Sequence, residues 1–158
     1  DFSPSNLIQR VNSILYEDLF QAEQFISVNY LRYVKPRQMI QYTSAGHPPP
    51  IIWRSSDGTF DEVGTDDPLL GIESRAVFHE RHIIVSKGDI IVLYTDGITE
   101  AARPDGERFG HDRFLECLSD AVVGTSKQIV DVIVESVQSF IDPIRLKDDI
   151  TALVIKVL

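Results

Sequence analysis

The N-terminal part of the chain carries a helical pattern of hydrophobic positions. Ser3 can cap a helix, and Pro4 suits the first helical position. Apolar residues then recur every three or four positions, at Leu7, Ile8, Val11, Ile14, Leu15 and Leu19. This spacing predicts an amphipathic helix whose apolar face must be covered by another element.

A change of period at Phe25 marks the start of strand-forming sequence. Residues 25–34 alternate imperfectly and are rich in β-branched and aromatic side chains, which predicts a strand. The turn at 35–37 leads to a second predicted strand at 39–44, so we expect a hairpin. The segment 45–50 ends that strand, because its three prolines give a sheet no hydrogen-bond donors.

Turn residues divide the middle of the chain into short apolar runs. These runs predict strands at 51–54, 59–60, 77–85 and 90–94. Ser56-Asp57-Gly58 is typical of a tight turn and predicts a hairpin between the first two. Lys87-Gly88-Asp89 also reads as a turn, and we expect the last two strands to lie in one antiparallel sheet.

The C-terminal part is expected to be helical and to close with a strand. Apolar residues at 114, 115, 118 and 122 mark one helix. Thr125-Ser126 can cap a second, whose apolar stripe ends at Ile141 before Pro143. A last buried strand is predicted over 150–158. The sequence contains no internal repeats or linkers, so we expect a single domain over residues 1–158.

Carboxylates stand where two predicted buried strands end and begin. Asp96 follows the strand at 90–94, and Asp148-Asp149 precedes the strand at 150–158. If these strands are antiparallel neighbours, the acids converge at one edge of the sheet. Such hard oxygen ligands suit Mg²⁺ or Mn²⁺, which can activate water without a side-chain nucleophile. The pattern alone leaves open an ordinary turn at Asp96 and a polar strand start at Asp148.

Other reactive side chains favour structural roles. His47 could act as a ligand or an acid, but a histidine between glycine and prolines is more typical of a positioned loop residue. The histidines show no metal-binding spacing, and Cys117 lies on an apolar helical stripe, as a small core residue does. A Ser/His/Asp hydrolase is not supported, since no Gly-x-Ser-x-Gly elbow occurs.

The composition of the chain limits which kinds of partner and which cellular compartment are expected. The chain has 24 Asp and Glu against 15 Lys and Arg, and no dense basic cluster, so nucleic acid is not an expected partner. The single cysteine excludes a disulfide framework and fits a reducing compartment, with the cytoplasm as the default. No apolar run approaches the roughly 20 residues of a membrane helix, so no membrane association is expected.

Several blocks together resemble the SpoIIE-type branch of the metal-dependent (PPM) serine/threonine protein phosphatases. They lie at 25–30, 45–50, 68–71, 88–110 and 148–151, in that order. The resemblance implies an α+β fold, an α-β-β-α sandwich of two antiparallel sheets flanked by helices. It also implies hydrolysis of phosphoserine or phosphothreonine by a metal-bound water, with two Mn²⁺ or Mg²⁺ ions.

The resemblance also implies roles for single residues. Asp96 and Asp148 match two family metal ligands and are the implied catalytic residues, while Asp149 is implied to bind water beside them and Gly97 to shape the backbone. Nothing in residues 1–30 resembles the family's N-terminal Gly-Asp strand, whose aspartate bridges both metals. The chain is therefore expected to be the C-terminal, larger part of such a domain, lacking the N-terminal strands and helix. Alone, it is expected to bind little or no metal and to be inactive.

Partners follow from the same resemblance. In bacteria such phosphatases usually act on a phosphorylated anti-sigma-factor antagonist and often follow sensory or receiver domains, which we expect of the parent protein. The competing hypothesis is a non-catalytic PPM-like binding or regulatory module. Strands without their N-terminal neighbours also predict a homodimer through open sheet edges. A Mg²⁺-dependent nucleotidase is a third possibility, but the chain has no phosphate-cradling glycine loop.

Overall fold

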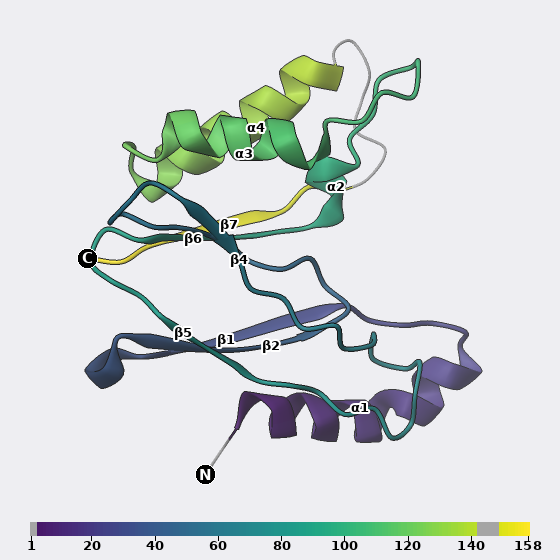
Figure 1. The fold of residues 1–158 in the computed structure, drawn as a ribbon. Coiled ribbons are helices and arrows are strands. Elements are labelled where there is room, and N and C mark those ends of the chain that lie inside the picture. Colours follow the sequence, from purple (N-terminus) through teal and green to yellow (C-terminus); the bar gives the residue numbers. More distant parts are fainter. Residues whose placement is uncertain (1–2, 142–148) are drawn as a thin grey trace. The chain divides into compact units, whose positions relative to one another are not determined.

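The computed structural model describes residues 3–141 and 149–158 (Figure 1). The chain forms two compact units. The first consists of Asp1–Pro49 and Val63–Ser86, and the second of Pro50–Glu62 and Lys87–Leu158. Each unit has its own antiparallel sheet.

The first unit places one long helix on a three-stranded sheet (Figure 1). Its elements are α1 (Pro4–Gln21), β1 (Val28–Val34), the 3-10 turn η1 (Lys35–Arg37), β2 (Met39–Ala45) and β5 (Arg81–Ile84). The strand order is β1-β2-β5, and the β1-β2 hairpin pairs Val28 with Ala45 and Val34 with Met39. The sheet alternates in side-chain direction, so one face of this hairpin is available to the helix.

The core of the first unit lies between α1 and that sheet face. Its buried members are Ile8, Leu19, Ala45, Leu70, Ala76 and Phe78. The buried Asn12 fastens the loop that follows Leu70: its Nδ2 donates to the Glu73 carbonyl at 2.8 Å, and its Oδ1 accepts from the Gly71 amide at 3.0 Å. Both polar ends of this buried amide are therefore satisfied, as burial requires.

The second unit is built on a four-stranded sheet of order β4-β3-β6-β7. The strands are β3 (Ile51–Trp53), β4 (Phe60–Glu62), β6 (Ile90–Tyr94) and β7 (Ala152–Lys156). β6 is paired on both sides, with Ile91 opposite Ile52 of β3 and Ile155 of β7. Ile90, Ile91 and Val92 are each 1% exposed, so side chains on both faces of β6 are buried, which explains its unbroken apolar sequence.

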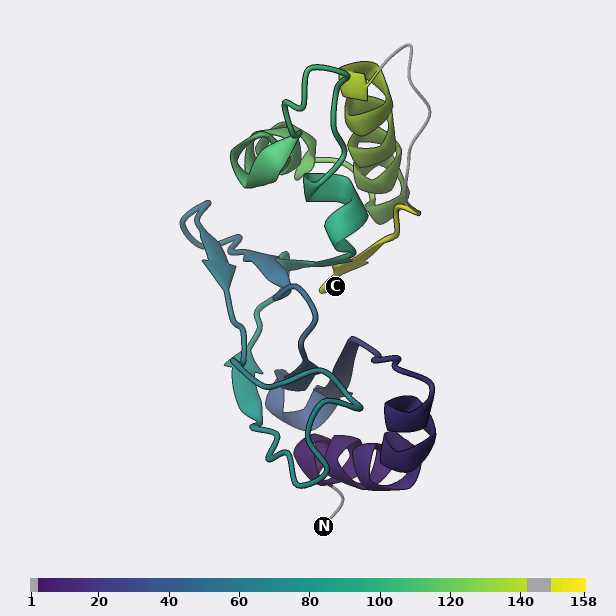
Figure 2. The same ribbon diagram turned by 90° about the vertical axis from the view of Figure 1, so that its right-hand side faces the viewer.

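Three helices belong to the second unit: α2 (Asp96–Thr99), α3 (Gly110–Ala121) and α4 (Ser126–Ile141). Figure 2 shows α3 and α4 on one face of the unit's sheet. Phe114, Leu118, Ile133 and Val137 form the centre of the core between them. Thr125 and Gln128 cap α4 reciprocally, since the Thr125 amide donates to Gln128 Oε1 at 2.8 Å and the Gln128 amide to Thr125 Oγ1 at 3.3 Å.

Most of the predicted helices and strands are present in the structure. The prediction of an α+β fold with two antiparallel sheets flanked by helices is confirmed. The predicted strand at 25–34 begins at Val28, although Ile26 still makes an isolated bridge to Leu70. The structure also contains the short helix α2, which the polar sequence after Gly97 did not indicate. Pro143 lies outside the described residues.

The prediction that the strands at 77–85 and 90–94 share one sheet is wrong. β5 pairs with β2, whereas β6 lies between β3 and β7 in the other sheet. Both long edges of β6 are occupied, so β5 cannot pair there. β5 is also shorter than expected, because His79 donates its amide to the Asp67 carboxylate at 2.8 Å and its carbonyl accepts from Thr43 Oγ1 at 2.8 Å.

Candidate metal centre

The candidate site lies where β6 ends and β7 begins. Tyr94 is the last residue of β6 and pairs with Ala152, the first of β7. Beyond this pair, the Thr95 amide donates to the Thr151 carbonyl at 3.1 Å, and the Thr151 amide donates to Thr95 Oγ1 at 3.0 Å. The two segments therefore stay side by side past the regular strands, which confirms that the end of one strand lies beside the start of the other.

Gly97 allows a close approach between the same two segments. A Cβ atom at this position would lie 2.4 Å from the carbonyl oxygen of Asp149 and 3.2 Å from its carbonyl carbon. No side chain fits at 2.4 Å from a backbone oxygen without a shift of one segment. The absence of a side chain, rather than an unusual backbone angle, is what this glycine contributes.

Asp96 is the first residue of α2, directly after β6. Its carbonyl accepts from the Glu100 amide at 2.8 Å and from Thr99 Oγ1 at 3.2 Å, which fixes its backbone. Its side chain belongs to a solvent-exposed residue, as does that of Asp149, immediately before β7. Two carboxylate-bearing positions thus stand on neighbouring segments at one sheet edge. Asp148 lies outside the described residues.

The donor set at this edge fits a hard divalent cation. Carboxylate oxygens are the ligands that Mg²⁺ and Mn²⁺ prefer. Within residues 3–141 and 149–158, no three His, Cys, Asp or Glu side chains lie close enough together to hold a metal ion. The described residues therefore supply carboxylates of the right chemistry but no complete ligand set.

An apolar foundation supports the Asp96 segment. Tyr94 packs edge-to-face on Phe114 of α3, with ring centroids 4.8 Å apart. Burial, with a smaller contribution from the negative charge of Glu62, raises the pKa of Tyr94 to about 12. The phenol therefore stays neutral at physiological pH. Ile98 of α2 is only 1% exposed, so its buried side chain attaches the short helix to the core.

A cation-π cluster ties the loop after α2 to the last turn of α4. The guanidinium of Arg103 lies 4.1 Å from the Phe140 ring centroid, and that of Arg113 lies 4.9 Å from it. Arg103 Nε also donates to the Phe140 carbonyl at 3.0 Å. Glu107 pairs with both arginines, and these bonds hold the pKa of its carboxyl below the usual range. The loop that leaves the Asp96 segment is thereby attached to the helix that precedes 142–148.

The remaining candidates have structural surroundings. His47 lies in the loop after β2, where its Nδ1 is 2.9 Å from Ser27 Oγ and its amide donates to Ser44 Oγ at 3.3 Å. Cys117 packs against the core of the second unit and donates to Ser136 Oγ at 3.3 Å. Burial raises the pKa of its thiol, which disfavours the nucleophilic thiolate.

Sequence reasoning missed two contributors to this site. It did not indicate that the Thr95 hydroxyl accepts a hydrogen bond from the Thr151 amide of the opposite segment at 3.0 Å. It also gave no role to Arg103, whose partner Phe140 is distant in the chain. A threonine after a buried strand is a weak signal, and a cation-π partner has no sequence signature.

Relatives of known sequence agree with the resemblance. A family model described as Stage II sporulation protein E (SpoIIE) matches residues 1–158. Phosphoserine phosphatase RsbU of Bacillus subtilis (strain 168) is 28% identical over 155 residues, which cover 97% of this chain and 45% of RsbU. The chain spans less than half the length of the curated relatives that it matches.

Solved structures agree with the fold. The SiaA-PP2C domain of Pseudomonas aeruginosa aligns with a TM-score of 0.81 and 17% identity, over 98% of this chain and 61% of that one. The phosphatase domain of SpoIIE from Bacillus subtilis, Mn presoaked, aligns with a TM-score of 0.69 and 18% identity, over 99% of this chain and 67% of that one. Since the family model covers every residue of the sequence, the chain belongs to the Stage II sporulation protein E (SpoIIE) family.

Proposed function

We propose that this chain is part of a metal-dependent phosphatase domain that removes phosphate from serine or threonine of a regulatory protein. The observation that carries the proposal is the junction of β6 and β7, where Thr95 bonds to Thr151 and Gly97 meets Asp149. It supports the proposal because the segment that carries Asp96 runs beside the segment that carries Asp149. Membership of the SpoIIE family, and the likeness to a relative named a phosphoserine phosphatase, support it.

Asp96 and Asp148 are the proposed metal ligands and catalytic residues. Asp149 would bind water, and Gly97 would keep the two segments in contact. When bound, Mn²⁺ or Mg²⁺ would stabilise charge on the phosphoryl oxygens and lower the pKa of water. The protein itself would fix the position of the Asp96 backbone. Three contacts contribute: the hydrogen bonds of Thr95, the packing of Tyr94 on Phe114 and the burial of Ile98.

Two ions require more ligands than these segments provide. We propose that the remaining ligand is an aspartate from sequence outside residues 1–158 and that this chain is the C-terminal, larger part of one domain. The 45% of RsbU that the chain spans leaves room for such a segment in a relative. The second candidate function is a PPM-like binding or regulatory module without catalysis.

The wider context is proposed from the relatives. A phosphorylated anti-sigma-factor antagonist in the cytoplasm is the expected substrate class, with a sensory or receiver domain in the parent protein. Among the residues that the structure describes, no helix combines the length and apolar composition needed to cross a bilayer. A homodimer through the sheet edges at β1, β5, β4 or β7 is also proposed, and a compact monomer in sedimentation at high concentration would contradict it.

Mn²⁺-dependent hydrolysis by the full-length parent protein tests the catalytic proposal. A phosphoserine protein is the substrate, and release of phosphate is measured with and without Mn²⁺. Asp96→Asn and Asp148→Asn are expected to remove the Mn²⁺-dependent rate. Asp120→Asn, an exposed aspartate on α3, is the matched control and should leave it unchanged. A full-length protein with no Mn²⁺-dependent activity would favour the regulatory module instead.

A further inference from the structure

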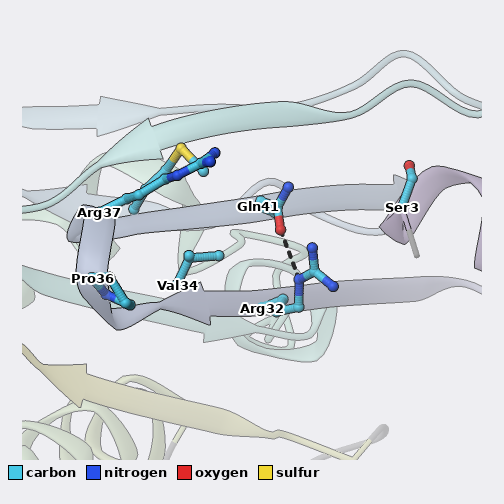
Figure 3. Close-up of a pocket in the computed structure, with 7 residues that line it drawn as sticks. Ser3, Arg32, Val34, Pro36, Arg37 and Gln41 are labelled. Atoms are coloured by element: carbon cyan, nitrogen blue, oxygen red, sulfur yellow. Dashed lines mark hydrogen bonds between the residues drawn. The ribbon is translucent and has the colours of Figure 1, made fainter. Parts of the chain in front are cut away.

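A pocket of about 350 Å³ opens in the first unit, on the β1-β2 hairpin beside the start of α1 (Figure 3). Its walls contain two arginines, Arg32 of β1 and Arg37 of η1. The apolar side chains of Val34, Pro36 and Met39 also line it. The volume is at the small end of the range of ligand pockets, which suits one functional group rather than an extended molecule.

The guanidinium of Arg32 is bonded to Gln41 through its Nε atom only. Arg32 and Gln41 are opposite each other in the β1-β2 register, and Arg32 Nε donates to Gln41 Oε1 at 2.7 Å (Figure 3). Gln41 Nε2 in turn donates to Glu80 Oε1 at 3.0 Å, so reversing the Gln41 amide would break both bonds. The two Nη nitrogens of Arg32 have no hydrogen-bond partner within the described residues.

The carboxylate of Glu80 is bonded to other groups and does not pair with Arg32. Glu80 accepts from Ser3 Oγ at 2.7 Å as well as from Gln41, and it lies 2.6 Å from His82 Nε2. Neither Arg32 nor Arg37 forms an ion pair with any residue that the structure describes. On a chain of net charge -9, this hollow thus presents two guanidinium groups whose charge is not paired.

We propose that this pocket binds a phosphate monoester group carried on a small apolar body. A guanidinium fork matches phosphate oxygens with paired hydrogen bonds, and two such forks balance the two negative charges of a phosphate dianion. Val34, Pro36 and Met39 would contact the adjoining carbon atoms of the ligand. The pocket shares no residue with the proposed metal centre, and the proposal does not depend on catalysis.

Titration of the metal-free chain with benzylphosphonate, followed by backbone and arginine Nε NMR signals at pH 8, tests the proposal. Benzylphosphonate is a dianion that no phosphatase can cleave to phosphate, and EDTA removes any metal. Saturable shifts are expected at residues 32–41. Arg32→Gln and Arg37→Gln should each weaken binding about tenfold or more, because each removes charged hydrogen bonds.

Two comparisons separate specific binding from general attraction. Arg75→Gln removes an exposed arginine of the same unit and should leave the affinity unchanged, and melting temperatures establish that all variants fold. Inorganic phosphate should bind more weakly than benzylphosphonate, because it lacks the apolar body. Equal binding of phenylacetate, equal loss with Arg75→Gln, or no saturable shift at residues 32–41 would each overturn the proposal.

Discussion

The carbonyl oxygen of Asp149 lies 2.4 Å from the point that a Cβ atom of residue 97 would occupy. Gly97 follows the strand that ends at Tyr94, and Asp149 precedes the strand that begins at Ala152. Their contact brings the backbones that carry Asp96 and Asp149 together. The geometry of the candidate site therefore depends on a residue that has no side chain.

Gly97→Ala is expected to destabilise the fold. The added methyl must displace a backbone oxygen, and overpacking of this kind costs about 1 to 3 kcal/mol of unfolding free energy. The gain of about 1 kcal/mol in helix propensity within α2 offsets only part of this. Urea unfolding measures the difference. Gly64→Ala is the control, because a Cβ there meets Pro49 at an ordinary 3.4 Å. Equal stability of the two variants would contradict the close approach.

Thr95→Val should loosen the junction of β6 and β7. Valine keeps the shape but cannot accept the Thr151 amide, which now lies 3.0 Å from the Thr95 hydroxyl. The expected loss of unfolding free energy is about 1 kcal/mol, the usual worth of one hydrogen bond. Hydrogen exchange of the Thr151 amide should also accelerate. Thr95→Ser retains the hydroxyl and should preserve both properties, and slow exchange in the valine variant would count against this role.

The Glu107 cluster predicts a pH dependence of stability. Hydrogen bonds from Arg113 and Arg103 lower the pKa of Glu107 from its usual value of 4.5. A lowered folded-state pKa stabilises the protein above the usual pKa, and this contribution is lost as the pH falls through the folded-state value. The melting temperature of Glu107→Gln should therefore fall below that of the wild type at pH 7, and the gap should narrow in acid. A gap independent of pH would refute the ionic explanation.

Tyr94 predicts a loss of stability in alkali. Its folded-state pKa is raised from 10.0 to about 12, so the folded state keeps its proton while the unfolded chain loses it. The resulting stabilisation is present below pH 10 and disappears between about pH 10 and pH 12. Over that window, the unfolding free energy of the wild type should decline more steeply than that of Tyr94→Phe. Parallel pH profiles would show that Tyr94 ionises freely in the folded protein.

The candidate site was partly predictable, because each of the two segments that form it has a local sequence pattern. Apolar runs next to Asp96 and Asp149 indicate buried strands with acids at their ends. Which strands are neighbours is not local information. The prediction that the strands at 77–85 and 90–94 share one sheet is wrong for that reason, since β5 pairs with β2, and β3 and β7 from distant parts of the sequence occupy both edges of β6.

The sequence by itself determined the elements whose signals lie within one element. α1 and α4 follow from helical periodicity, and α4 also from its N-terminal cap, whereas the Ser3 hydroxyl donates to Glu80 and does not cap α1. The β1-β2 hairpin follows from alternation around a proline turn. Only the tertiary structure decided the division of strands between two sheets, the Thr95–Thr151 bond, and the stacking of Arg103 on Phe140. These depend on contacts between residues far apart in the chain, whose free energy is realised only when the sheet and its helices have packed.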